Sequence, residues 1–407
     1  GEAVSLKNIA RVYWRLGKYP EALKYFKLSS KLYKNTKDIS GKAESLRGIG
    51  AVHYCLCNYK KALEYYNQSL KGHVKTDSRR AQSTTLNNIG IVYKCLGKYE
   101  KANEYYLDSL KIATEIGYRY GMAVTLNNIA SIYRDLEDYT KAMDFYKKSL
   151  LIHEEVNDRR GEAICLQNIG ELHYNLGDYQ QALNFFQGSL TKTKAIGDRQ
   201  LEACILNNLG HFFRDIGNYQ RAKKLYKNSI KVATKIGDRR IELENLIGLG
   251  TLYLQKKNYH EAEKYLRKAH AIDKKLKPNY IQAEILYCLS SLYLEKKDHK
   301  KAEVFYKSLK KLVAELNLRG PKAKALCLSG RLYGSKPDFE ESIEIFKNLK
   351  KNFELAKVYY YYGILLREQS KKKKASGYFK QAKRIFEKIG AKDWTKKVNI
   401  IQKKSRK

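Results

Sequence analysis

The stretch LNNIGIVYKCLGKYEKANEYYLDSL, residues 86–110, contains two apolar patterns that are separated by a short turn. The first pattern comprises Leu86, Ile89, Gly90 and Tyr93, and the second comprises Ala102, Tyr105, Tyr106, Ser109 and Leu110. In both patterns these residues recur at the spacing of one face of an α-helix. Gly97 lies between the patterns and favours a turn. The stretch therefore predicts a helix, a turn and a second helix.

The same pattern recurs along the chain every 40 residues. A leucine column comprises Leu6, Leu46, Leu86, Leu126, Leu166, Leu206, Leu246, Leu286 and Leu326. A small-residue column comprises Ala10, Gly50, Gly90, Ala130, Gly170, Gly210, Gly250, Ser290 and Gly330. Such a period is typical of stacked helical hairpins, and the small residues predict a close approach of two backbones.

The register of the repeat changes once, near the end of the chain. Gly363 follows Gly330 by 33 residues, so we expect one shorter-linked hairpin after the nine regular repeats. We predict an all-α fold in which residues 1–390 form a single right-handed superhelical α-solenoid of about ten antiparallel helix hairpins. The four prolines and the absence of a Gly/Ser-rich stretch leave no candidate for a flexible linker.

The segment after residue 390 has its own amphipathic pattern. Trp394, Val398 and Ile401 lie on one side of an expected helix that is otherwise rich in lysine. Solenoids need terminal units with a polar outer face. Residues 391–407 are therefore predicted to be a basic C-terminal capping helix and tail.

The spacing Leu-x2-Ile-Gly-x2-Tyr, followed by Ala-x3-Tyr, resembles the tetratricopeptide repeat, with Leu86 in place of the family's usual tryptophan. The unit here has 40 residues instead of the commoner roughly 34. This longer form resembles the repeats of cell-polarity adaptors, kinesin light chains and bacterial signalling proteins. The resemblance covers nearly all of the chain. It implies a protein-binding scaffold or sensor, or the regulatory part of a larger signalling protein.

Two repeats end in the sequence Ile-Gly-Asp-Arg, at residues 196–199 and 236–239. Gly197 and Gly237 are placed to adopt the left-handed conformation that ends a helix. Asp198 and Asp238 follow them and are placed to cap the next helix. We interpret this motif as structural and not as a binding site.

The resemblance implies that the first helix of each hairpin lines a concave groove. An asparagine column lies two residues before the small-residue column, at Asn8, Asn88, Asn128, Asn168 and Asn208. A side-chain amide has both a donor and an acceptor for the backbone of an extended peptide. Gly48 and Gly248 interrupt the column, so we centre the predicted peptide groove on the stretch from Asn88 to Asn208. The alternative is that these amides bind the neighbouring hairpin and set its angle.

The same expected face carries charged residues of both signs. The cations predicted to meet carboxylates of a bound segment are Arg11, Lys94, Arg134 and Arg214, and the acids Asp135, Glu171 and Asp215 share this face. The mixture favours a peptide that carries both charges, and we expect a protein or peptide ligand with acidic character.

The chain is strongly basic, with 80 Lys and Arg against 42 Asp and Glu and a formal charge of +38. Residues 371–407 contain 15 of the basic residues, and Lys371, Lys372, Lys373 and Lys374 form their densest run. Electrostatic binding of nucleic acid or acidic partners through this basic surface is the alternative function. Residues 359–362 are four consecutive tyrosines, of which a helix should expose at least one.

The sequence contains no phosphate-binding glycine loop, zinc-protease motif or nucleophile elbow, so we expect a protein that is not an enzyme and has no cofactor. His53 and His173 replace a repeat tyrosine and are interpreted as core residues.

The seven cysteines indicate reduced, intracellular thiols, and Cys55 and Cys57 should point to different sides of a helix, so no metal site is predicted. The chain shows no membrane span, which predicts a cytoplasmic protein, and its start at Gly1 inside the first helix suggests a fragment or processed chain.

Overall fold

The computed structural model describes residues 1–56, 58–136, 138–176, 178–273, 280–316, 319–349, 351–388 and 390–404. These residues form 21 helices and no strand, which confirms the predicted all-α fold class. They form two compact units, Gly1–Leu172 and His173–Lys407. The prediction of one continuous domain over residues 1–390 stays a prediction. Cys57 and the last three residues of the predicted tail lie outside the described residues.

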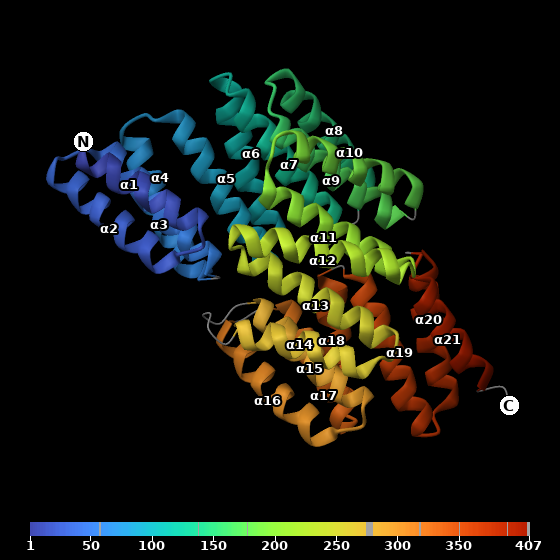
Figure 1. The fold of residues 1–407 in the computed structure, drawn as a ribbon. Coiled ribbons are helices and arrows are strands. Elements are labelled where there is room, and N and C mark those ends of the chain that lie inside the picture. Colours follow the sequence, from blue (N-terminus) through green and yellow to red (C-terminus); the bar gives the residue numbers. More distant parts are fainter. Residues whose placement is uncertain are drawn as a thin grey trace. The chain divides into compact units, whose positions relative to one another are not determined.

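The first unit is built from consecutive antiparallel helix pairs (Figure 1). Its helices are α1 (Glu2–Arg15), α2 (Tyr19–Asn35), α3 (Ile39–Cys55), α4 (Tyr59–Lys75), α5 (Arg79–Cys95), α6 (Tyr99–Glu115), α7 (Arg119–Asp135) and α8 (Tyr139–Glu155). The helix α9 (Arg159–Leu176) crosses the boundary between the units. We call the first helix of each hairpin an inner helix. Neighbouring inner helices α1, α3, α5 and α7 contact one another and form one continuous face.

The second unit continues the same pattern of hairpins. Its helices are α10 (Tyr179–Ala195), α11 (Arg199–Asp215), α12 (Tyr219–Ile236), α13 (Arg239–Gln255), α14 (Tyr259–Asp273), α15 (Tyr280–Glu295), α16 (His299–Leu316), α17 (Arg319–Tyr333), α18 (Lys336–Asn348), α19 (Asn352–Glu368), α20 (Lys372–Lys388) and α21 (Lys392–Lys404). The inner helices α11, α13, α15, α17 and α19 contact one another in turn.

Ring stacking joins the two helices of a hairpin. His53 stacks on Tyr65 with ring centroids 5.4 Å apart, and His173 stacks on Phe185 at 5.2 Å. In other hairpins a tyrosine makes the equivalent stack. The two histidines therefore act as substitutes for the repeat tyrosine, which confirms their interpretation as packing residues.

The small-residue column lets the second helix of a hairpin approach the inner helix closely. A Cβ atom at Gly90 would lie 2.5 Å from the ring of Tyr106, and one at Gly210 would lie 2.6 Å from the ring of Tyr226. Both rings belong to the second helix of the same hairpin and are fully buried. Glycine is needed here because an aromatic ring covers the inner helix. At Gly90 the backbone carbonyl oxygen of Ala102 would also lie 3.1 Å from the Cβ atom, so the expected close approach of two backbones is part of the cause.

The Ile-Gly-Asp-Arg motif ends one helix and begins the next. Gly197 and Gly237 have φ angles of 69° and 72°, in the left-handed region that favours glycine. The side chains of Asp198 and Asp238 each accept a hydrogen bond from the backbone amide three residues later, at 2.9 and 3.0 Å. The predicted structural role of the motif is confirmed.

The C-terminal helix α21 is anchored within the second unit. Trp394 is 8% exposed and stacks on Phe386 at 5.3 Å, and Val398 is fully buried. The hydroxyl of Tyr179 donates a hydrogen bond of 2.8 Å to the backbone carbonyl of Gly390. The turn before α21 is therefore tied to α10, the first helix that lies wholly in this unit.

Helix α21 also explains why one expectation failed. None of the four tyrosines at 359–362 is exposed: Tyr359 and Tyr362 are buried, and Tyr360 and Tyr361 are half-buried. Trp394 lies against the latter two, with centroid distances of 5.5 and 6.2 Å. The prediction of an exposed tyrosine was wrong because α21 packs against α19. It covers the side of α19 that would otherwise face solvent.

Candidate functional site

The predicted asparagines lie on inner helices, where all four are half-buried. Asn88 is on α5, Asn128 on α7 and Asn168 on α9, all in the first unit, whereas Asn208 is on α11 in the second. The structure therefore places three of the four on one face. Asn208 is described within its own unit only.

Two of these asparagines bind the preceding hairpin. Nδ2 of Asn128 donates to Oδ1 of Asn87 at 3.0 Å, and Nδ2 of Asn168 donates to Oδ1 of Asn127 at 2.8 Å. These bonds match the alternative interpretation, in which the amides fix the angle between hairpins. Within the described part of the chain, the Oδ1 atoms of Asn128 and Asn168 accept no hydrogen bond, so each keeps an acceptor for a ligand.

The predicted groove cations are paired with groups on their own or the next inner helix. Nζ of Lys94 lies 2.6 Å from Oγ of Ser131 and 3.6 Å from the carboxylate of Asp135. Nη1 of Arg134 donates to Glu171 at 2.6 Å. These cations hold neighbouring hairpins together, so a ligand carboxylate has to compete with Asp135 and Glu171 for them.

Arg214 behaves in the same way in the second unit. Its guanidinium donates to both carboxylate oxygens of Asp215, at 2.7 and 3.1 Å, and to Oγ1 of Thr251 at 3.3 Å. Burial alone would lower the pKa of Arg214, but Asp215 and Tyr226 raise it overall. The charge is therefore permanent and largely balanced by its own neighbour.

A cavity of about 320 Å³ opens on the inner-helix face of the first unit. Its lining comes from α1 to α5 and includes Arg11, Trp14, Glu44, Arg47, Gly48 and Asn88. We call this cavity the Gly48 pocket. Asn88 and Arg11 are the predicted groove residues among those that line it.

Gly48 lies at the pocket and lets an aromatic ring approach the inner helix, because it has no side chain. It occupies the asparagine column, one repeat before Asn88. A Cβ atom at Gly48 would lie 2.4 Å from the ring of Phe26, which also lines the pocket and is 3% exposed. The ring therefore fills the place of a side chain and forms the floor of the pocket. In the sequence, Gly48 was interpreted as an interruption of the asparagine column. The one sequence feature that could have indicated the pocket is this glycine in a column of polar residues.

Two aromatic side chains contribute walls to the pocket. Nε1 of Trp14 donates to Sγ of Cys55 at 3.3 Å, and the hydroxyl of Tyr54 lies 3.6 Å from Sγ of Cys95. Because the polar atoms of both rings already have partners, their carbon faces remain to contact a ligand. Trp14 is 36% exposed.

The polar side of the pocket carries two guanidinium groups and one carboxylate. Nη2 of Arg47 and Nη2 of Arg11 lie 2.7 and 3.2 Å from Oε2 of Glu44. Burial alone would raise the pKa of Glu44, but Arg47 and His73 lower it overall, so the group is a carboxylate. Burial, with Arg11 and Arg47, lowers the pKa of nearby Lys7 although Glu44 opposes this. The cations outnumber the acid here.

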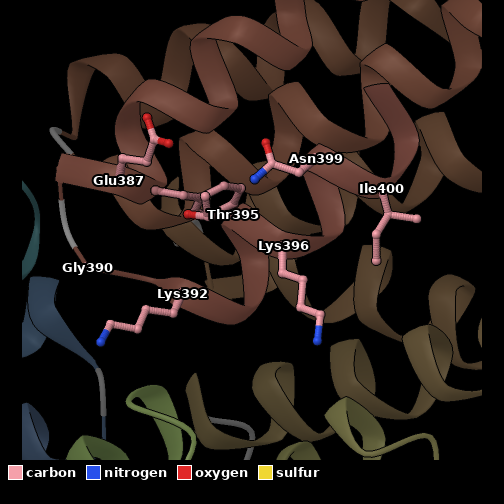
Figure 2. Close-up of a pocket in the computed structure, with 8 residues that line it drawn as sticks. Glu387, Gly390, Lys392, Thr395, Lys396, Asn399 and Ile400 are labelled. Carbon is pink, nitrogen blue, oxygen red and sulfur yellow. The ribbon is translucent and has the colours of Figure 1, made fainter. Parts of the chain in front are cut away.

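A second cavity, of about 560 Å³, lies between α20 and α21 (Figure 2). Thr395, Asn399 and Ile400 of α21 line it, and Figure 2 shows the side chains of Lys392 and Lys396 extending to the same side of that helix. This cavity is formed by two consecutive helices at the end of the second unit. It involves none of the predicted groove residues.

The predicted basic surface is accessible. Lys371, Lys372, Lys373 and Lys374 are all exposed at the start of α20. The ammonium group of Lys336 approaches Lys371 and lowers its pKa. Lys336 and Lys371 are therefore two positive charges close together. Among the described contacts, neither of them pairs with an acidic side chain.

Neither a membrane-spanning helix nor a cluster of metal ligands occurs among the described residues. None of the described helices is long and apolar enough to cross a bilayer. No group of three or more His, Cys, Asp or Glu side chains within the described ranges is arranged to hold a metal ion.

The repeat hairpins and their column residues define a class of protein. The tetratricopeptide repeat family model matches residues 1–73, 41–115, 121–194 and 201–275. The chain belongs to the tetratricopeptide repeat family. A search of proteins with curated functions returned no significant match.

Solved structures with a similar fold support this membership. A Rap protein complexed with competence and sporulation factor is 13% identical, with a TM-score of 0.60 over 93% of this chain and 98% of its own. The apo form of the quorum sensor NprR from B. thuringiensis is 17% identical, with a TM-score of 0.54 over 92% of this chain and 99% of its own. The apo form of RapI is 19% identical, with a TM-score of 0.52 over 68% of this chain and 100% of its own. At these identities the likeness establishes the fold.

Proposed function

We propose that this chain is a non-enzymatic, cytoplasmic scaffold or sensor module that binds a peptide or protein segment along the inner helices of its first unit. The observation that carries the proposal is the Gly48 pocket, which interrupts a face otherwise closed by contacts between hairpins. Asn88 lies at this pocket, and Asn128 and Asn168 extend its polar ladder along the same unit. Concave surfaces of stacked repeats are suited to extended ligands.

Two similar structures support a peptide ligand. One is a Rap protein in complex with competence and sporulation factor, and another is described as a quorum sensor. Both share the fold of this chain over more than nine-tenths of its length. A regulatory module that recognises a peptide is consistent with both, and Asn208, Lys94, Arg134 and Arg214 remain proposed contacts.

The experiment is capture of a partner from a lysate of the source cells on the purified chain, with nuclease treatment and with washes at low and high salt. The wild type is compared with an Asn128→Ala, Asn168→Ala double variant. We expect a protein that survives nuclease and high salt and that is depleted on the double variant. Equal recovery on both chains would remove the asparagine ladder from the proposed site.

A second candidate function rests on the exposed lysines at 371–374. Such a cluster neutralises phosphates, and binding of this kind weakens steeply with salt. Recovery of nucleic acid alone, lost in the high-salt wash, would favour this function over peptide binding.

A further inference from the structure

We propose that the Gly48 pocket selects a peptide with one large apolar side chain, aromatic or branched aliphatic, flanked by a carboxylate. This inference rests on the proposed peptide-binding function and specifies its ligand. The pocket has an apolar floor and walls, formed by Phe26, Trp14 and Tyr54, and a cationic side formed by Arg11 and Arg47.

The size of the pocket fits one anchor residue. Small-molecule sites occupy about 300–1,000 Å³, and the Gly48 pocket, at about 320 Å³, lies at the lower limit. Binding energy in protein interfaces concentrates on a few side chains that fill such pockets. Ile91 of α5 adds an aliphatic surface to the lining, so an apolar anchor meets carbon atoms on several sides.

The charges around the pocket select the flanking residue. Arg11 makes one hydrogen bond, to Glu44, and 49% of its side chain is exposed, so other guanidinium N–H groups face solvent. A ligand carboxylate beside the pocket would pair with these exposed N–H groups of Arg11. The guanidinium of Arg47, whose Nη2 lies 2.7 Å from Oε2 of Glu44, adds positive charge on the same side.

The occupant is a peptide and not a second copy of this chain. Each copy has a formal charge of +38, so two copies repel each other. The lining of the pocket carries the cations Arg11 and Arg47 and the carboxylate of Glu44, and this excess of positive charge attracts an acidic segment. Charge complementarity therefore points to a peptide of opposite sign.

The test is a selection with a phage-displayed library of random 12-residue peptides on the full chain. We expect enrichment of an aromatic or branched aliphatic residue next to Asp or Glu. Arg11→Glu should change the flanking preference from acidic to basic residues, because it reverses the sign of the exposed charge. For an enriched peptide synthesised on its own, replacement of the apolar anchor by alanine should weaken binding about tenfold or more.

Gly48→Asn is the filling variant, and Gly248→Asn is its matched control, since both glycines occupy the same repeat column. Gly48→Asn should reduce affinity for the selected peptide about tenfold or more, with little change for the control. Because the new side chain displaces the ring of Phe26, circular dichroism must show that the variant is folded. Trp14→Ala, at a partly exposed wall, provides a second variant that leaves this floor intact.

Binding to chains that keep Trp14 is read from Trp14 fluorescence in a Trp394→Phe background, which leaves a single tryptophan at the pocket. Binding to Trp14→Ala, which lacks this fluorophore, is measured by isothermal titration calorimetry beside the wild type. Selected peptides that lack an apolar anchor, or that bind Trp14→Ala and Arg11→Glu as tightly as the wild type, would overturn the inference. If those peptides still depended on Asn128 and Asn168, the proposed function would stand without the anchor pocket. A selection that enriches no peptide would overturn both.

Discussion

At the scale of single residues, the inner-helix column shows two uses of the same position. The Nδ2 groups of Asn128 and Asn168 each donate a hydrogen bond to the preceding hairpin, and their Oδ1 atoms can still accept a hydrogen bond from a ligand. Asn88 makes no such bond among the described residues and lies at the pocket instead. At Gly48 the same column position has no side chain, and the ring of Phe26 lies in its place. Substitution at this column therefore determines whether a repeat is joined to its neighbour or open to a ligand.

This difference predicts unequal effects on stability. Asn128→Ala should lower the free energy of unfolding by about 0.5–1.5 kcal/mol, because it removes the hydrogen bond to Asn87. Asn88→Ala is the matched control, from the same column one repeat earlier, and should change it less. Urea unfolding followed by circular dichroism measures both. Equal losses would show that the bond to Asn87 contributes nothing.

A half-buried ion pair in the second unit predicts a pH dependence. Nζ of Lys357 lies 3.0 Å from Oε2 of Glu354. Burial by itself would raise the pKa of Glu354, but Lys357 and Lys324 lower it to about 2, from an ordinary value of 4.5. A lowered pKa stabilises the folded state fully above pH 4.5, and this contribution is lost as the pH falls toward about 2.

Glu354→Gln should therefore lower stability at pH 7 by roughly 3 kcal/mol or less. The difference from the wild type should shrink as the pH falls from 4.5 to 2. Thermal unfolding over this range measures it, with Glu344→Gln as an exposed control from α18. A difference that stays constant with pH would contradict the assigned role of the carboxylate.

At the scale of elements, the sequence predicted the hairpins well because each depends on local apolar spacing and on caps such as Gly237 and Asp238. The site was predicted less well because it depends on contacts between helices. The floor of the pocket is the ring of Phe26 from α2, and its cations are held by Glu44. A column of inner-helix residues does not contain this information. The tyrosines at 359–362 were misjudged for the same reason, since α21 covers them.

Helix α21 is predicted to be an integral part of the second unit. Trp394→Ala should cost about 3–5 kcal/mol, because the indole is buried among aromatic rings of α19 and α20. Trp394→Phe is the control and should cost less, since it keeps a ring in place. Urea unfolding followed by circular dichroism tests this. A loss below about 1 kcal/mol for the alanine variant would mean that α21 packs weakly.

The burial of α20 and α21 also changes how the basic surface should be tested. Deletion of residues 371–407 would remove buried Phe379, Phe386 and Trp394 and would expose the core of the second unit. Substitution of all four lysines at 371–374 by glutamine avoids this, because these side chains are exposed. We expect the variant to bind a selected peptide within about twofold of the wild type and to lose affinity for nucleic acid at low salt. Loss of peptide binding would move the site to this surface.

At the scale of the whole molecule, the chain combines regular repeats with one local exception. Each repeat contacts mainly its neighbours, so binding at one position can be transmitted by small changes between successive hairpins. The contacts that would carry such changes in the first unit are those of Asn128 with Asn87, of Asn168 with Asn127 and of Arg134 with Glu171.

The central claim is that the inner-helix face of the first unit binds a peptide. Amide hydrogen exchange of the full chain, with and without a selected peptide, tests it most directly because it locates the contact in every helix at once. We predict slower exchange in α1, α3 and α5 when the peptide is present, and loss of this protection in Trp14→Ala. Protection confined to α20 and α21, or no protection in the first unit under saturating peptide, would contradict the account.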